Sequence, residues 1–186
     1  MEQQCDLAAV RDLTIAAGGG TDHFIDPATC RATLNAPRVL AAVAPSADFQ
    51  LSAAVEVAFE STFDAGVLML WADDLTWAKL CLEYSPQERP MVVSVVTRGL
   101  SDDANAVTVD ADQTWLRISR SGAAYAFHCS TDGQHWDLVR HFALPAEPAA
   151  VRAGFSAQSP TGAGCVAQFT QVRFVETPVA DLRDGT

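Results

Sequence analysis

The sequence predicts one all-β domain over residues 1–186, an antiparallel β-sandwich of the jelly-roll kind. From Phe49 onward, short apolar runs are separated by turn residues at hairpin spacing, which is typical of consecutive antiparallel strands. Almost no stretch keeps a 3.6-residue apolar period over three turns, so helices between the strands are not expected. The chain has 186 residues, of which 49% are hydrophobic, and this is enough for one continuous core.

The elements follow in order along the chain. Residues 1–20 are expected to be a less regular N-terminal segment, in which only residues 3–13 suit a short helix. Gly18–Gly20 and the following TDHFIDP favour loops. Residues 176–186 are expected to form a C-terminal tail. Strands are expected at 49–60, 66–72, 76–84, 91–98, 105–110, 114–120, 123–130, 135–143, 150–157 and 165–175.

Alternation along the strand 76–84 assigns its two faces. Leu80, Leu82 and Tyr84 recur at every second position and are expected to face the core, which leaves Lys79 and Glu83 on the other side. Turn chemistry separates the strands, since Asp-Gly and similar pairs accept the backbone angles of tight turns. The expected turns lie at Asp73-Asp74, Ser85-Pro86, Ser121-Gly122 and Asp132-Gly133.

Charge and cysteine content exclude several classes of function. The formal net charge of -11 disfavours nucleic acid and anionic membranes as partners, because both repel an acidic surface. No apolar run approaches the roughly 20 residues that span a bilayer, and the first residues lack the pattern of a secretory signal. The five cysteines are scattered without a CxxC pair, which is typical of reduced thiols. We therefore expect a cytoplasmic protein.

Six strings in the central part of the chain carry a family resemblance. In this order they resemble the regulation-of-enolase-protein-like family, a family of domains of unknown function within the concanavalin A-like lectin/glucanase superfamily. The upstream TDHFIDP and LNAPRVL are similar to the same family. The resemblance implies a sandwich with one convex and one concave sheet, and a defined role near the groove rim for the segment after residue 100. The strings are DAGVLMLW, WAKLCLEYSP, VVSVVTRGLSDDAN, WLRISRSG, AFHCSTDGQHWDLVRHFAL and GFSAQSP.

Polar side chains on otherwise apolar strands form the candidate ligand site. Lys79 and Glu83 lie about 13 Å apart on one strand face, so they do not pair with each other and each needs a partner elsewhere or faces water. The functional interpretation is a polar groove on the concave sheet that takes an anionic or polyhydroxyl ligand. The alternative is an ordinary solvated sheet face. The expected groove residues are Trp77, Lys79, Glu83, Arg98, Asp102, Asp103, Arg117, His128 and Gln158.

Three further motifs have a structural and a functional interpretation. The segment Ser101–Asn105 gathers oxygen ligands of the kind that calcium prefers, but it does not match an EF-hand loop, and a simple loop is the alternative. Ser130–Trp136 is similar to an Asp-box turn, in which Asp132 accepts turn amides and Gly133 supplies positive φ. Trp77 is the best candidate for stacking on a sugar, although core packing is the usual role of a strand tryptophan.

Sharper catalytic signals are absent from the sequence. There is no GxSxG, P-loop, GxGxxG or HExxH motif, and we expect no metal and no cofactor. Glycoside hydrolysis needs paired carboxyl groups, whereas the strand 76–84 carries Glu83 alone. Our leading hypothesis is a ligand-binding domain, for a sugar or sugar phosphate, with a possible regulatory role. The alternatives are a carbohydrate-active hydrolase, with Glu83 as acid/base and His128 or Asp103 as its partner, and a homodimeric interaction module.

Overall fold

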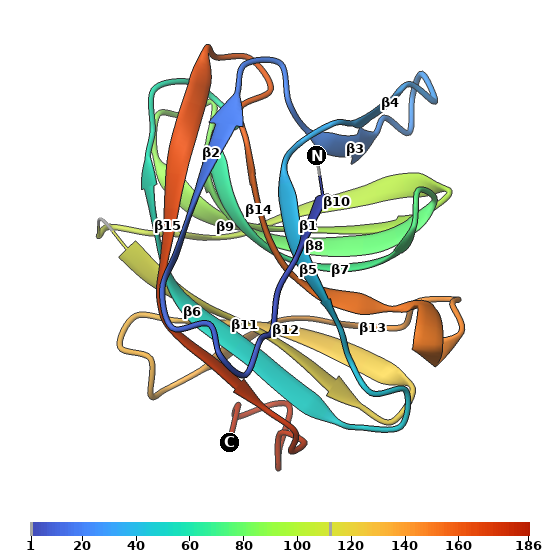
Figure 1. Ribbon diagram of the computed structural model, residues 1–186. Helices are drawn as coiled ribbons and strands as arrows, with labels where there is room; N and C mark the ends of the chain where they lie inside the picture. Colours follow the sequence, from blue (N-terminus) through green and yellow to red (C-terminus); the bar gives the residue numbers. More distant parts are fainter. Residues whose placement is uncertain (1, 112) are drawn as a thin grey trace.

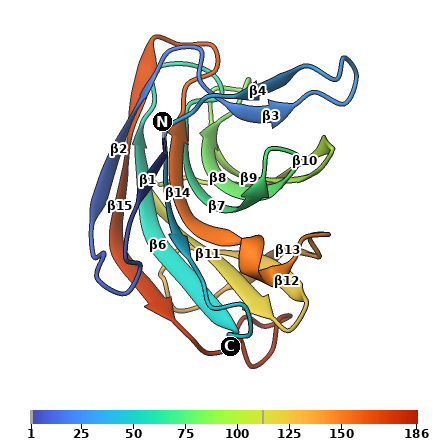
Figure 2. The same cartoon turned by 45° about the vertical axis from the view of Figure 1, so that its right-hand side comes forward.

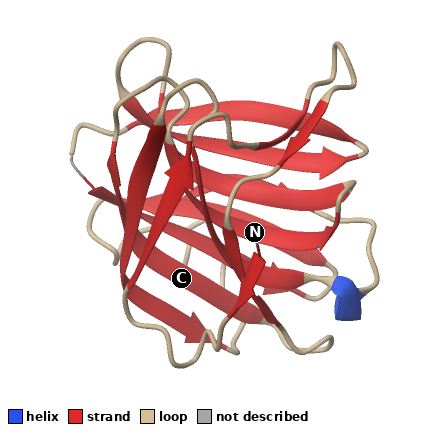
Figure 3. Ribbon diagram, turned by 45° about the horizontal axis from the view of Figure 1, so that its top comes forward, coloured by secondary structure: helices blue, strands red, loops and turns tan. Residues whose placement is uncertain are grey.

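The protein is a jelly-roll β-sandwich, seen here in a computed structural model that describes residues 2–111 and 113–186 (Figure 1). Within these residues the chain forms fifteen strands and one short 3₁₀ helix, η1 (Pro148–Ala150), with no α-helix (Figure 3). The strands lie in two large sheets and one small hairpin. The fold class that the sequence predicts is confirmed.

A seven-stranded sheet forms the first layer. Its neighbours pair antiparallel except at one edge, where β1 runs parallel to β5. In spatial order its strands are β1 (Glu2–Gln4), β5 (Arg38–Ala42), β14 (Arg152–Gln158), β7 (Ala65–Asp73), β8 (Thr76–Tyr84), β9 (Pro90–Arg98) and β10 (Leu100–Thr108).

A six-stranded antiparallel sheet forms the second layer, which Figure 2 shows packed against the first. Strands far apart in the sequence are neighbours in it, because β6 lies between β11 and β15. In spatial order its strands are β13 (Asp137–Phe142), β12 (Ala124–Ser130), β11 (Gln113–Ser121), β6 (Phe49–Ala58), β15 (Gly164–Val175) and β2 (Leu13–Gly18).

The main core fills the space between the two sheets. Alternate residues of the central strands point into it, as Leu80 and Leu82 of β8 and Leu116 and Ile118 of β11 illustrate. These side chains are fully buried, so the alternation that the sequence predicts for β8 is confirmed. Tyr84, at the end of β8, is only half-buried and stacks on Phe59 instead.

A second apolar cluster lies on the outer face of the seven-stranded sheet. It is covered by a hairpin, β3 (His23–Ile25) and β4 (Ala32–Leu34), which we call the β3–β4 arm and which projects over this sheet in Figure 2. The His23 ring of the arm lies 5.2 Å from Trp71, which stacks on Trp77 at 5.9 Å. The arm is also joined to β10, since the backbone N–H of Ile25 donates to the Ser101 hydroxyl.

The structure confirms nine of the ten expected strands nearly at their predicted bounds and corrects two other expectations. Residues 3–13 do not form a helix, because β1 and the start of β2 use the ends of this segment in long-range pairing. Ser101–Asn105 is not a loop, because β10 begins at Leu100 and pairs with β9 directly after a turn at Gly99, whose φ is 83°. The strand expected at 105–110 is therefore displaced toward the N-terminus.

The Asp-box turn has the geometry that the sequence predicts. One carboxylate oxygen of Asp132 accepts the backbone N–H groups of Gln134 and His135, at 2.8 Å each. Gly133 has a φ of 72°, which favours glycine. The hydrogen bonds are local, so the structural interpretation of this motif suffices.

Candidate functional site

A hollow on the outer face of the seven-stranded sheet gathers polar side chains from four parts of the chain. Its volume is about 190 Å³. We call it the Lys79 pocket, after the buried side chain at its base. It is lined by Asp22, Phe24, Phe63, Lys79, Glu83, Val95, Asp103, Gln158 and Pro160.

Strand register brings these side chains together. Lys79 on β8 is directly opposite Val95 on β9, and Val95 is opposite Asp103 on β10. Two rows further along the same face, Glu83 pairs with Ala65 on β7, which pairs with Gln158 on β14. Residues in one cross-strand row project to the same face, so the pocket spans five adjacent strands.

Lys79 is held at the base of the pocket by two hydrogen bonds. Its ammonium donates to Asp22 Oδ1 at 3.0 Å and to Gln158 Oε1 at 2.8 Å, and its side chain is only 2% exposed. Burial is the largest single influence on the pKa of Lys79 and would lower it. The charge and hydrogen bond of Asp22, together with Cys81 and Glu83, more than offset burial, so the pKa lies above its ordinary value. Lys79 is therefore a fixed positive charge.

Two carboxyl groups face Lys79 with raised pKa values. Burial raises the pKa of Glu83 to about 7, against the opposing effect of the Lys79 charge. Burial likewise raises the pKa of Asp103 above its ordinary value. No described residue donates a hydrogen bond to Glu83. This carboxyl group is thus available as a donor when protonated and as an acceptor when ionised.

We expect Glu83 to titrate near pH 7 in the folded protein. A carboxyl ¹³C chemical-shift titration measures this midpoint, with Glu83→Gln assigning the resonance. In Lys79→Met the midpoint should move further up, because the Lys79 charge is the main influence that holds the pKa of Glu83 down. A midpoint near the ordinary value of 4.5 would contradict the buried environment described above.

Trp77 shares this face but is not open to a ligand. Its side chain is fully buried between Trp71 and the arm, and its indole Nε1 has no hydrogen-bond partner among the described residues. The expectation that Trp77 stacks on a sugar is therefore wrong for this arrangement. Phe24 and Phe63 are the aromatic residues that line the pocket.

Four predicted groove residues lie elsewhere. Arg117 and His128 belong to β11 and β12, so they lie on the outer face of the other sheet. Arg98 and Asp102 occupy alternate positions to those that face the pocket. Arg98 donates to the Ala143 carbonyl at 3.2 Å, and Asp102 pairs with Arg140 at 2.9 Å. The predicted convergence is thus corrected, because alternation assigns a side chain to one side of its strand and does not say which sheet the strand joins.

Sequence reasoning missed the contribution of the N-terminal region to the pocket. Asp22 and Phe24 come from TDHFIDP, which was expected to be a loop, and Phe63 comes from the turn before β7. The positive φ of Phe63, 72°, places it in an unusual backbone conformation for a large residue, and the residue is 37% exposed. The one sequence signal for this contribution is that TDHFIDP places the acidic Asp22 close to apolar residues such as Phe24.

Comparison with known proteins identifies the family. The family model described as "Protein of unknown function (DUF1349)" matches residues 3–177. The chain belongs to the DUF1349 family. This bears out the family resemblance of the central strings.

Two proteins from yeast are similar to this DUF1349 chain, one in sequence and one in fold. It is 33% identical over 98 residues to "Regulation of enolase protein 1" of Saccharomyces cerevisiae, a match that covers 52% of this chain and 49% of that protein. The chain therefore matches about half the length of its curated relative. A functionally unknown protein from Saccharomyces cerevisiae has the same fold, with a TM-score of 0.80 and 24% identity over 89% of this chain and 88% of the other.

The fold also occurs within larger enzymes. Xylan β-1,4-xylosidase from Bacillus halodurans C-125 matches with a TM-score of 0.59 and 16% identity, over 70% of this DUF1349 chain and 28% of the enzyme. At this identity the likeness shows the fold alone. It does not bring the reaction of that enzyme to this chain.

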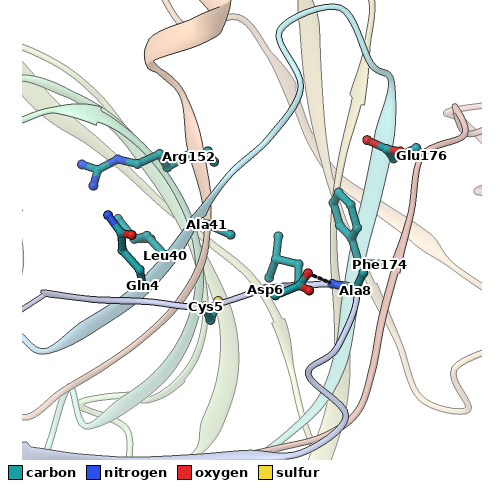
Figure 4. Close-up of a pocket in the computed structure, with 11 residues that line it drawn as sticks. Gln4, Cys5, Asp6, Ala8, Leu40, Ala41, Arg152, Phe174 and Glu176 are labelled. Carbon is teal, nitrogen blue, oxygen red and sulfur yellow. Dashed lines mark hydrogen bonds between the residues drawn. The ribbon is translucent and has the colours of Figure 1, made fainter.

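A larger hollow lies beside the N-terminal segment of the DUF1349 chain, but its residues do not form a comparable site. Its volume is about 500 Å³, and Figure 4 shows Cys5, Asp6, Phe174 and Glu176 around it. The acidic side chains there are exposed, and Arg152 already pairs with Glu2. Asp6 accepts the backbone N–H of Ala8. The Lys79 pocket is smaller, yet it alone of the two has a buried charge at its base.

The described part of the DUF1349 chain has neither a metal-binding cluster nor a membrane-spanning helix. Over residues 2–111 and 113–186, no group of three or more His, Cys, Asp or Glu side chains is placed to hold a metal ion. The same residues contain no helix with the length and hydropathy that a membrane crossing requires.

Proposed function

We propose that the Lys79 pocket binds a small, neutral, polyhydroxylated ligand of about monosaccharide size. The observation that carries the proposal is the convergence of five polar residues around one hollow. They are Lys79, Glu83, Asp103, Gln158 and Asp22, which directly precedes the β3–β4 arm. Hydroxyl groups both donate and accept, so they suit a mixed set of an ammonium, an amide and carboxyl groups. The rings of Phe24 and Phe63 supply the apolar part of the lining.

Size and charge narrow the ligand class. The 190 Å³ volume lies below the roughly 300–1,000 Å³ of sites for drug-sized ligands, so the ligand is small. One ammonium faces three carboxyl groups, those of Asp22, Glu83 and Asp103, and an anionic ligand would meet repulsion. A sugar phosphate would need the positive charges of Arg117 and His128, which lie on the other sheet. Without them, a neutral sugar or polyol fits better.

The hydrolase alternative is less well supported. An acid and its partner carboxylate usually have environments that push their pKa values apart. In the Lys79 pocket, burial raises the pKa of both Glu83 and Asp103. A domain in which the pKa values of the acid and its partner are not pushed apart suits ligand binding and a regulatory role. This is in keeping with the name of the yeast relative.

A thermal-shift screen of neutral monosaccharides and polyols tests the proposal. At about ten times its dissociation constant, a true ligand stabilises the fold by about 1.4 kcal/mol and should raise the melting temperature of the full chain by about 3–6 °C. Glu83→Gln should remove most of this response, and Lys79→Met should remove it as well. The matched control is Glu88→Gln, at an exposed turn outside the pocket, which should respond like the wild type.

Two results would count against the proposal. One is a panel in which no neutral sugar or polyol raises the melting temperature. The other is a response that Glu83→Gln retains in full. Because Glu83→Gln keeps the size of the side chain and removes only the ionisable group, loss of folding does not confuse this comparison.

A further inference from the structure

The outer face of the six-stranded sheet contains a buried guanidinium without an acidic partner. Arg117 is 5% exposed, and among the described residues no Asp or Glu forms an ion pair with it. Burial lowers the pKa of Arg117 to about 10. Buried arginines are usually paired with a carboxylate, because an uncompensated charge is costly to bury. The isolation of Arg117 is unexpected in a chain with 23 acidic residues.

Neutral groups hold the guanidinium of Arg117 in place. Its Nη2 donates to the Gly185 carbonyl at 2.8 Å, and Nη1 has a long hydrogen bond of 3.4 Å to Gln50 Oε1. The guanidinium also lies 4.3 Å from the centre of the Trp136 ring. Nε has no partner in the described part of the chain. These contacts fix the position of the charge without neutralising it.

A hollow of about 470 Å³ lies against this guanidinium, and we call it the Arg117 hollow. Arg173 also borders it. Both arginines are register partners of Ser52 on the strand between them, so their backbones lie about 10 Å apart. No carboxylate of the described chain lines the Arg117 hollow, in contrast to the Lys79 pocket. Its lining consists of Gln50, Ser52, Trp115, Arg117, Gly133, Trp136, Gln171, Arg173, Val175 and Thr177.

We propose that the Arg117 hollow is a second binding site, for a small ligand that carries a phosphate or carboxylate group. Such a group supplies the counter-charge that Arg117 lacks, and Arg173 contacts it from the exposed side. The amides of Gln50 and Gln171 and the Ser52 hydroxyl add neutral donors. Trp115 and Trp136 form walls for the rest of the ligand. This site lies on the opposite outer face from the Lys79 pocket and does not depend on the function proposed for that pocket.

The ligand preference of the two sites should be opposite. The Lys79 pocket has an excess of carboxyl groups, whereas the Arg117 hollow has two guanidinium groups and no acid among its described lining residues. A neutral sugar therefore suits the first and an oxyanion the second. This contrast allows one protein sample to report on both sites.

Thermal melting of the full chain with inorganic phosphate tests the proposal. We expect 10 mM phosphate to raise the melting temperature by about 2–4 °C over chloride at equal ionic strength. Arg173→Gln should abolish this rise, and because Arg173 is exposed the variant should fold normally. Arg117→Gln should abolish it too. Arg89→Gln, which removes an exposed arginine on the turn before β9, is the matched control and should keep it.

The indole N–H signals of the four tryptophans locate the bound ion. Phosphate should shift the ¹H–¹⁵N signals of Trp115 and Trp136 and leave those of Trp71 and Trp77 unchanged. Acetate in a parallel titration separates a carboxylate site from a phosphate site, and a specific response to either supports the proposal. Absence of any anion-specific response, or an equal response in Arg173→Gln, overturns it. Glu83→Gln should still respond, so failure of this proposal is distinct from failure of the first.

Discussion

Replacing Gly154 by alanine is expected to disrupt the seven-stranded sheet. Gly154 lies in β14 between Leu40 of β5 and Met69 of β7. A Cβ atom at this position would collide with the Val39 carbonyl oxygen and lie 3.0 Å from Leu40 Cα. Both are backbone atoms, which move only if β5 moves. We expect a loss of at least about 3 kcal/mol in the free energy of unfolding, or about 6–12 °C in melting temperature.

Gly18→Ala is the matched control for Gly154→Ala. Gly18 also lies in a strand, β2, but a Cβ there would meet no atom of the described chain within 4 Å. Its stability should stay close to that of the wild type, since alanine restricts the unfolded chain without a clash. Equal melting temperatures for Gly154→Ala and wild type would show that β5 does not approach β14 as closely as described.

Acid should destabilise the protein through His23. Burial, assisted by the positive charges of Lys79 and Arg38, lowers the pKa of His23 to about 3. Neither ring nitrogen has a hydrogen-bond partner among the described residues. Between pH 6.5 and 3, His23 is therefore protonated in the unfolded state and neutral in the folded state. The free energy of unfolding falls as the pH is lowered through this window. From pH 7 to pH 4, the loss from His23 is about 3 kcal/mol.

Comparison with His23→Leu isolates this contribution. Glu83 has the opposite effect, because its raised pKa of about 7 stabilises the fold as the pH falls toward 4.5, so the wild-type profile is a sum of both. In urea titrations at pH 7 and pH 4, His23→Leu should lose about 3 kcal/mol less than the wild type. His141→Gln removes an exposed histidine and should follow the wild type. Parallel profiles for His23→Leu and wild type would contradict the prediction.

The local sequence pattern predicts the long strands well, because the order of apolar and polar residues within each strand reflects which of its side chains are buried. The strand predicted at 76–84 has the bounds of β8, since apolar and polar side chains alternate along it and turn residues stand at both ends. The short strands before Phe49 have no comparable sequence pattern from which they could be predicted. β1 and β2 have three and six residues, and they are strands only because β5 and β15 lie beside them. Pairing partners at this distance in sequence are invisible to a local pattern.

The candidate site was predicted in part for the same reason. Lys79, Glu83, Asp103 and Gln158 belong to strands that enter one sheet, and their placement on a common face is correct. Arg117 and His128 alternate in the same way, but β11 and β12 pair with β6 and β13 in the other sheet. The order of the strands in space decides which of the two sheets a strand joins. That order follows from long-range packing and not from the local sequence. Arg117 therefore carries its unpaired charge on the outer face of the six-stranded sheet, away from the Lys79 pocket.

The position of Asp22, directly before β3, and of Phe24 on the β3–β4 arm has a kinetic consequence. Two-stranded hairpins are marginally stable on their own, so the arm depends on its contacts with the sheet, including the ion pair of Asp22 with Lys79 and the hydrogen bond of Ile25 to Ser101. A ligand of the kind proposed for the Lys79 pocket would compete with the first of these contacts. Association would then be gated by detachment of the hairpin, and the observed rate constant would level off at high concentration instead of rising without limit.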